Sequence, residues 1–121
     1  MKKKLLVLFL LLTVVSFTKT YYGKEEGIAT VYSSLNLSRP VLKNQTAQSI
    51  MDEFTRIVYE AEVDYSVAPE KDYGKIDDYY MKRTNAALEK MDKNLSGISD
   101  QDAEKMMVHL DKLQAIVDSY E

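Results

Sequence analysis

Hydrophobic residues in the second half of the chain recur at intervals of three and four, which is the spacing of one face of an α-helix. In the first such segment the apolar positions are Ala47, Ile50, Phe54, Val58, Ala61 and Tyr65. Six of the 13 positions between them are charged, so the segment predicts an amphipathic helix over roughly residues 46–67. Thr46 is its predicted N-cap, and Pro69 ends this helix or begins the next one.

Two more stripes of the same kind predict helices over roughly residues 70–96 and 99–120. The apolar positions of the second stripe are Tyr73, Ile76, Tyr80, Thr84, Ala87, Met91 and Leu95. Those of the third stripe are Ala103, Met106, Leu110, Leu113, Val117 and Tyr120. Leu110 and Leu113 occupy the centre of the third stripe, and both are therefore expected to be buried against the other helices.

The connection between these two helices is short and rich in residues that end and begin helices. Gly97 is predicted to adopt the left-handed conformation after the second helix. Ser99 is predicted to cap the third helix, with Asp102 as a capping-box partner. A short connection favours antiparallel neighbours. The predicted fold is therefore all-α, a small three-helix bundle that forms one domain over residues 46–121.

Residues 19–45 form an irregular or short-helical segment ahead of this bundle. Ile28, Val31, Tyr32 and Leu35 have helical spacing. The β-branched and aromatic content of the same stretch would also suit a strand. A single strand would have no partner elsewhere in the chain, so a short helix is the preferred interpretation.

The first 18 residues are predicted to be a signal peptide. Lys2, Lys3 and Lys4 precede an apolar run from Leu5 to Val15, the layout of a secretory leader. That run is shorter than the roughly 20 residues of a membrane-spanning helix. Cleavage is the preferred interpretation, and an uncleaved anchor is the alternative. After cleavage no stable membrane span is expected.

The charge and the absence of cysteine narrow the class of protein. The leader removes three of the 16 basic residues and none of the 19 acidic ones, so the net charge moves from −3 to about −6. An acidic domain argues against nucleic acid and anionic membrane surfaces as partners. Small secreted eukaryotic domains are usually rich in disulfides. Without cysteine, the chain fits a secreted or periplasmic protein of the bacterial envelope better.

Three asparagines, Asn36, Asn44 and Asn94, each begin an N-glycosylation acceptor pattern. This feature would fit a eukaryotic secreted protein. Asparagine, serine and threonine also gather at helix ends and turns, where their side chains bond to the backbone. Helix capping is the preferred explanation, and glycosylation stays open.

Residues 92–102 partly resemble a calcium-binding EF-hand loop. Asp92, Asn94 and Ser96 supply oxygen atoms at the first, third and fifth positions, and Gly97 follows. The twelfth position, which requires a glutamate, holds Ala103. The loop is therefore interpreted as a pair of helix caps, and neither a metal site nor a cofactor is expected.

No pattern predicts catalysis. His109 is the only histidine, and no nucleophile or carboxylate is placed beside it by the sequence pattern, so it is expected at the edge of the core. The acidic groups at 60–64 and 77–78 diverge around a helix by about 100° per residue. They are interpreted as parts of solvated faces, and no catalytic residue is assigned.

The nine tyrosines are the unusual feature of the composition. Tyr59 and Tyr79 fall off the apolar stripes of their helices and are expected to be exposed. Tyrosine is enriched at protein interfaces, although tyrosines also fill small cores. The sequence thus predicts a non-enzymatic secreted or periplasmic protein that binds another protein, with Tyr59 and Tyr79 as candidate contacts. Inhibitor, immunity-type protein, adhesin and assembly accessory are the candidate roles; a small-ligand or calcium-binding envelope module is the alternative.

Overall fold

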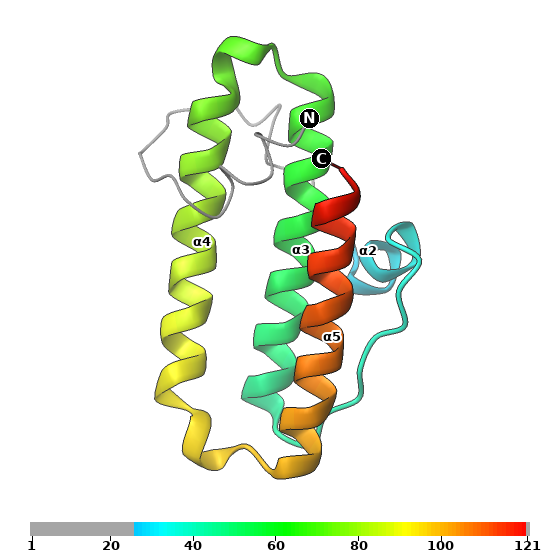
Figure 1. The fold of residues 1–121 in the computed structure, drawn as a ribbon, viewed down its shortest axis with the longest axis vertical. Helices are drawn as coiled ribbons and strands as arrows, with labels where there is room; N and C mark the ends of the chain where they lie inside the picture. The colour runs from blue at the N-terminus through cyan, green and yellow to red at the C-terminus, as the bar shows by residue number, and fades with distance from the viewer. Residues whose placement is uncertain (1–25, 121) are drawn as a thin grey trace.

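The computed structural model describes residues 26–120, in which three long helices run side by side along the molecule (Figure 1). The α-helices are α2 (Ile28–Ser34), α3 (Gln45–Val67), α4 (Tyr73–Lys93) and α5 (Asp100–Ser119). Two single-turn 3₁₀ helices, η1 (Glu70–Asp72) and η2 (Leu95–Gly97), flank α4. The described residues contain no strand, which confirms the predicted all-α class and adds α2 to the three expected helices.

The long helices follow the predicted ranges, with one difference in α4. The sequence predicts a single helix over 70–96, whereas a 3₁₀ turn replaces its first three residues, the α-helix ends at Lys93, and a second 3₁₀ turn follows over Leu95–Gly97. The Asp72 N–H donates to the Pro69 carbonyl oxygen (2.9 Å), and the Gly97 N–H donates to the Asn94 carbonyl oxygen (3.1 Å). Tightening of this kind is common where a helix ends and its backbone groups lose their regular partners.

The helix α3 is the centre of the molecule. It packs against α4 on one side, α5 on another and α2 on a third, while α4 and α5 make almost no contact with each other. In Figure 1 these two helices stand apart, with α3 between and behind them. The helices α2, α4 and α5 are therefore arranged around the central α3, and among residues 26–120 no further helix lies over the groove between α4 and α5.

The core follows the predicted stripe of α3 closely. The fully buried side chains on this helix include every apolar position of the predicted stripe, namely Ala47, Ile50, Phe54, Val58, Ala61 and Tyr65. On α5, Leu113 is buried but Leu110 is only partly buried, so the expectation that both are fully covered is wrong for Leu110. Leu110 lines the groove between α4 and α5, where none of the described helices completes its burial.

Residues 26–44 belong to the same core. Val31 and Leu35 of the α2 region and Leu42 of the following linker are buried against the bundle. The preferred short helix is therefore confirmed. Asn36 ends it with a φ of 59°, a left-handed conformation that asparagine tolerates better than most residues. The Leu37 N–H donates to the Tyr32 carbonyl oxygen (2.9 Å), the hydrogen bond of a Schellman motif.

The connection between α4 and α5 is tied to the start of α3 by side chains. Ser99 caps α5 as predicted, accepting from the Asp102 N–H (3.1 Å). Asp102 does not bond back to it: its carboxylate instead accepts from the N–H groups of Lys43 (3.1 Å) and Asn44 (2.9 Å). These two bonds hold the pKa of Asp102 below its usual value. The capping-box assignment of Asp102 is therefore wrong.

Two further expectations about the helix ends are also wrong. The N-cap of α3 is Asn44, whose side chain accepts from the Ala47 N–H (2.9 Å), and Thr46 lies inside the helix. Gly97 does not have a positive φ. It lies in η2, and its carbonyl oxygen accepts from the Asn44 side-chain amide (2.9 Å). The Asn44 side chain thus caps α3 with its oxygen and binds the turn before α5 with its amide nitrogen.

Candidate functional site

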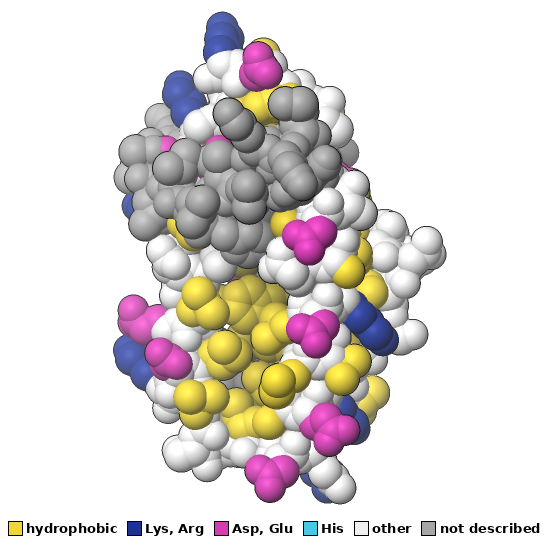
Figure 2. Space-filling view, in the orientation of Figure 1, with side chains coloured by type: hydrophobic (Ala, Val, Ile, Leu, Met, Phe, Trp, Pro, Cys, Tyr) yellow, Lys and Arg dark blue, Asp and Glu magenta, His cyan; other side chains and the backbone are white. Residues whose placement is uncertain are grey.

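An apolar groove lies between α4 and α5, with α3 as its floor. Phe54, Ile57 and Val58 of α3 form the floor together with the buried Leu113 and Val117 of α5. Thr84 and Leu88 line it from α4, and Leu110 and Gln114 from α5. Figure 2 shows apolar side chains gathered on this face, between the two helices.

The groove is shallow and apolar. Its enclosed volume is about 180 Å³, smaller than the roughly 300–1,000 Å³ of small-molecule sites. Leu88 at its edge is 43% exposed, and Met107 on the neighbouring turn of α5 is 67% exposed. Exposed apolar residues that cluster in this way are typical of protein-interaction surfaces.

The local sequence explains why the groove stays open. Along α4, Leu88 is one turn from Thr84, so both lie on the side that faces α5. Leu110 and Gln114 have the same spacing along α5. These four side chains line the walls of the groove, and the buried Phe54, Ile57 and Val58 of α3 lie at its bottom.

The two tyrosines predicted as contacts lie elsewhere. Tyr59 and Tyr79 are both partly buried and pack against the core, so the expectation that they are exposed is wrong. The Tyr79 ring packs edge-on against that of Tyr80 at 4.8 Å, and the Arg83 guanidinium lies 5.8 Å from its centre. Neither tyrosine lines the apolar groove.

Sequence reasoning missed the groove residues because it searched for unusual residue types. Leu88 was the available signal: it is a large apolar residue outside the stripe of its own helix. Met107, which flanks the stripe of α5, was a second signal. Off-stripe apolar residues on two helices are a sign of an interface when those helices flank a common partner.

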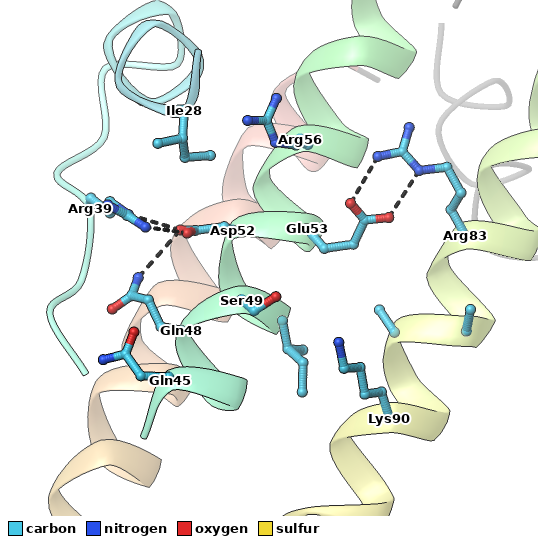
Figure 3. A pocket seen from close by; sticks show the side chains of 13 residues that line it. Ile28, Arg39, Gln45, Gln48, Ser49, Asp52, Glu53, Arg56, Arg83 and Lys90 are labelled. Atoms are coloured by element: carbon cyan, nitrogen blue, oxygen red, sulfur yellow. Dashed lines mark hydrogen bonds and ion pairs between the residues drawn. The ribbon is translucent and has the colours of Figure 1, made fainter. Parts of the chain in front are cut away.

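A second, polar cavity of about 600 Å³ lies on the other side of α4 (Figure 3). Arg39 reaches Asp52 from the linker, and Arg83 of α4 donates to Glu53 (2.9 Å) and Glu60 (2.6 Å) of α3. Figure 3 shows Lys90 and Arg56 on opposite sides of the space between these pairs. The cavity therefore combines compensated ion pairs with two further cations.

A chain of hydrogen bonds crosses the core between α2, α3 and α5. Tyr32 donates to Asp52 (2.9 Å), while the Thr55 hydroxyl lies 3.1 Å from the Tyr32 hydroxyl and 2.8 Å from His109 Nε2. Burial lowers the pKa of His109, so the ring is neutral at pH 7. His109 is buried and does not lie at the edge of the core as expected. Its buried ring nitrogen has a hydrogen-bond partner in the hydroxyl of Thr55, which is also buried.

Three of the acidic residues interpreted as solvated are buried, so that interpretation is wrong for them. Asp64 accepts a hydrogen bond from the Tyr80 hydroxyl, and burial raises its pKa to about 7. Asp77 and Asp78 are also buried, and burial raises the pKa of Asp77 to about 7 as well. The Asp64–Tyr80 contact joins α3 to α4.

Two residues at the end of the loop that resembles an EF-hand, Ser99 and Asp102, use their side-chain oxygen atoms internally. Asp102 is occupied by two backbone N–H groups, and Ser99 by a third. Within residues 26–120, histidine and acidic side chains do not gather in groups of three or more that could hold a metal ion. No helix in that range is long and apolar enough to cross a membrane.

Comparison of the chain with protein-family models, with curated proteins and with solved structures gives no match. The groove and the polar cavity are therefore the features from which a function is inferred.

Proposed function

We propose that this protein is exported and binds another protein, which inserts a helix into the apolar groove between α4 and α5. One observation carries the proposal: α4 and α5 flank α3 with almost no backbone contact between them, and an apolar groove opens between the two helices. In a four-helix bundle this is the position of the fourth helix. A helix supplied by a partner would bury Leu88 and Leu110, as in other complexes that seat a helix in a groove.

The export part of the proposal rests on the leader. The Lys2–Lys4 cluster and the apolar run that follows lie outside the described residues, so only the sequence pattern supports it. We expect the mature protein to begin near residue 19, in the periplasm or the medium. Intact-mass measurement of protein recovered from those fractions tests this, and a recovered protein that retains Lys2–Lys4 contradicts it.

The groove is tested by capture of the partner. Immobilised exported protein is incubated with envelope extract, and the captured protein is identified, purified and titrated back to obtain a Kd. Leu88→Lys places a charge on the groove edge, where it costs little stability because the side chain is already 43% exposed. The matched control is Val67→Lys, at an exposed apolar residue at the end of α3.

The expected result is that wild type and Val67→Lys bind the purified partner equally, whereas Leu88→Lys binds it at least about tenfold more weakly, because a buried lysine charge in an apolar contact is costly. A partner that binds Leu88→Lys as tightly as wild type places the interface elsewhere and contradicts the proposal.

The alternative function is binding of a small anionic ligand in the polar cavity. Its support is a volume of about 600 Å³, inside the usual range for small-molecule sites. Lys90 and Arg56 supply positive charge there. Calorimetric titration with inorganic phosphate, compared between wild type and Lys90→Ala, tests this alternative. Saturable heat that Lys90→Ala removes would support it, and the absence of heat at millimolar phosphate would contradict it.

A further inference from the structure

The edge of the groove on α5 is acidic. Asp111 and Asp118 are seven residues apart, so they lie on one side of the helix, within the stretch of α5 that lines the groove or one residue beyond it. Both are exposed. The Asp118 carboxylate accepts from the Gln114 side-chain amide (2.9 Å), and Gln114 lines the groove. Figure 2 shows acidic side chains along this border of the apolar surface.

The basic residues of α5 lie on its other side. Lys105 donates to the Val41 carbonyl oxygen of the linker (3.1 Å), and Lys112 lines the same cavity beside residues 38–41. These are the only two lysines of α5, which has no arginine. The linker side of α5 thus holds both lysines together with Glu104, which lines the same cavity, whereas the groove border holds Asp111 and Asp118 and no lysine or arginine of α5.

The edge on α4 adds no positive charge next to Leu88. The residues three before and four after Leu88 are its neighbours on the outer helix surface. They are Asn85 and Asp92, and both are exposed. A segment lying in the groove would therefore contact apolar side chains along its centre, acidic side chains on one edge, and neutral or acidic side chains on the other.

We infer that the groove accepts an amphipathic helix that carries lysine or arginine along the edges of its apolar stripe. This inference rests on the proposed function and names the chemistry of the partner. Complementary charge favours such a helix and disfavours a second copy of this chain, because self-docking would bring the acidic border of one copy against another acidic protein. Exposed charges are screened by salt, so the preference should weaken as salt rises.

Two designed peptides test the inference on the exported protein. Both form a helix with leucine at positions 1, 4, 8 and 11; lysine flanks the stripe in one, and glutamate in the other. Their affinities are measured by fluorescence anisotropy at low and high salt. We expect the lysine peptide to bind at least about tenfold more tightly at low salt, since several weak surface pairs act together. At high salt this ratio should shrink towards one.

Charge reversal within the protein is the matched control. Asp111→Lys, on the groove border, should reduce the preference for the lysine peptide, whereas Glu70→Lys makes the same change of net charge on an exposed residue of η1 and should leave it unchanged. An equal reduction by both variants would mean that only overall charge matters, and would overturn the inference. Equal affinity for the two peptides, a preference for glutamate, or no binding of the lysine peptide would also overturn it.

The proposed function is judged separately. If the peptides bind equally but Leu88→Lys abolishes binding of both, the groove is a protein-binding site and only the charge inference fails. If Leu88→Lys affects neither the peptides nor the captured partner, the proposed function fails. Sedimentation velocity checks the protein alone: a dimer that Leu88→Lys dissociates would make a second copy the occupant and overturn the inference.

Discussion

The helix α5 meets the rest of the molecule along two edges with different chemistry. On the edge towards the linker, His109 bonds to Thr55, Lys105 to the Val41 carbonyl oxygen, and Asp102 to two backbone N–H groups. On the edge towards α4, Leu110 faces an open apolar groove. Buried polar groups with partners fix one arrangement because leaving them unpaired is costly. The edge towards the linker, the closed edge, thus positions α5. The edge towards α4, the open edge, is where we propose that a partner binds.

The largest expected effect is a difference in unfolding free energy between a variant at the floor of the groove and a variant at its edge. Leu113→Ala removes a buried side chain and should lower the free energy of unfolding by about 2–5 kcal/mol, through lost burial and the cavity left behind. Leu88→Ala, on the exposed edge, should change it by no more than about 0.5 kcal/mol. Urea unfolding of both variants measures the difference. Similar losses in the two would mean that the groove is closed in solution.

The second effect concerns the contact between Asp64 of α3 and Tyr80 of α4, which helps to hold α4 against α3. Burial raises the pKa of Asp64 from 3.8 to about 7; Glu60 adds to this, and the Tyr80 hydroxyl and Arg83 oppose it. The folded state therefore holds this proton more tightly than the unfolded state. The stabilisation from Asp64 is complete below about pH 4 and is lost as the pH rises through about 7. At about 1.4 kcal/mol per pKa unit, the loss is on the order of a few kcal/mol.

Asp64→Asn tests this pH dependence. Asparagine is neutral at every pH and keeps an oxygen that can accept from Tyr80, so stability should fall less between pH 5 and pH 8 than in wild type. Urea unfolding at the two pH values is the measurement. Asp77 shifts in the same direction and keeps part of the slope, while His109 acts oppositely below its usual pKa in both proteins. Equal slopes in wild type and variant would contradict the assignment.

A smaller effect is expected when the closed edge loses one hydrogen bond. Thr55→Val keeps the shape of the side chain but removes the hydroxyl beside His109 Nε2. A buried ring nitrogen then lacks its partner, which should cost about 1–3 kcal/mol. Thr55→Ser is the control, because it retains the hydroxyl. If Thr55→Val were as stable as wild type, the polar chain would not be what positions α5.

The stripes of apolar residues were sufficient to predict the helices and most of the core, because burial of one face determines each helix. They could not predict how the helices are arranged around α3. Leu110 and the buried Leu113 belong to the same apolar stripe, yet Leu110 is only partly buried because it lines the groove between α4 and α5. The groove is a property of that arrangement, and no single helix contains it.

Polar residues were harder to place for a related reason. Asp102 stands in a capping position next to Ser99, and local rules assign it there; its actual partners, the N–H groups of Lys43 and Asn44, are more than 50 residues away. Asp64 appears in an alternating acidic run, but Tyr80 on another helix accounts for its burial. Local sequence contains no information about such distant partners.

The smallest expected effect is that of calcium, and it tests whether the turn at residues 92–102 belongs to the closed edge or forms a metal site. Millimolar calcium should leave the melting temperature unchanged, because the twelfth position of the loop holds Ala103 and the neighbouring Asp102 carboxylate already accepts from two backbone N–H groups. A site filled at a hundred times its Kd would stabilise the fold by about 2.7 kcal/mol, a shift that is easily measured.

Asp102→Ala should lower the melting temperature equally with and without calcium, since it removes the bonds between this turn and the start of α3. Asp92→Ala, at an exposed position, should change neither value. An upward shift with calcium that Asp92→Ala removes would make the turn a metal site, and the closed edge would then depend on an ion as well as on hydrogen bonds.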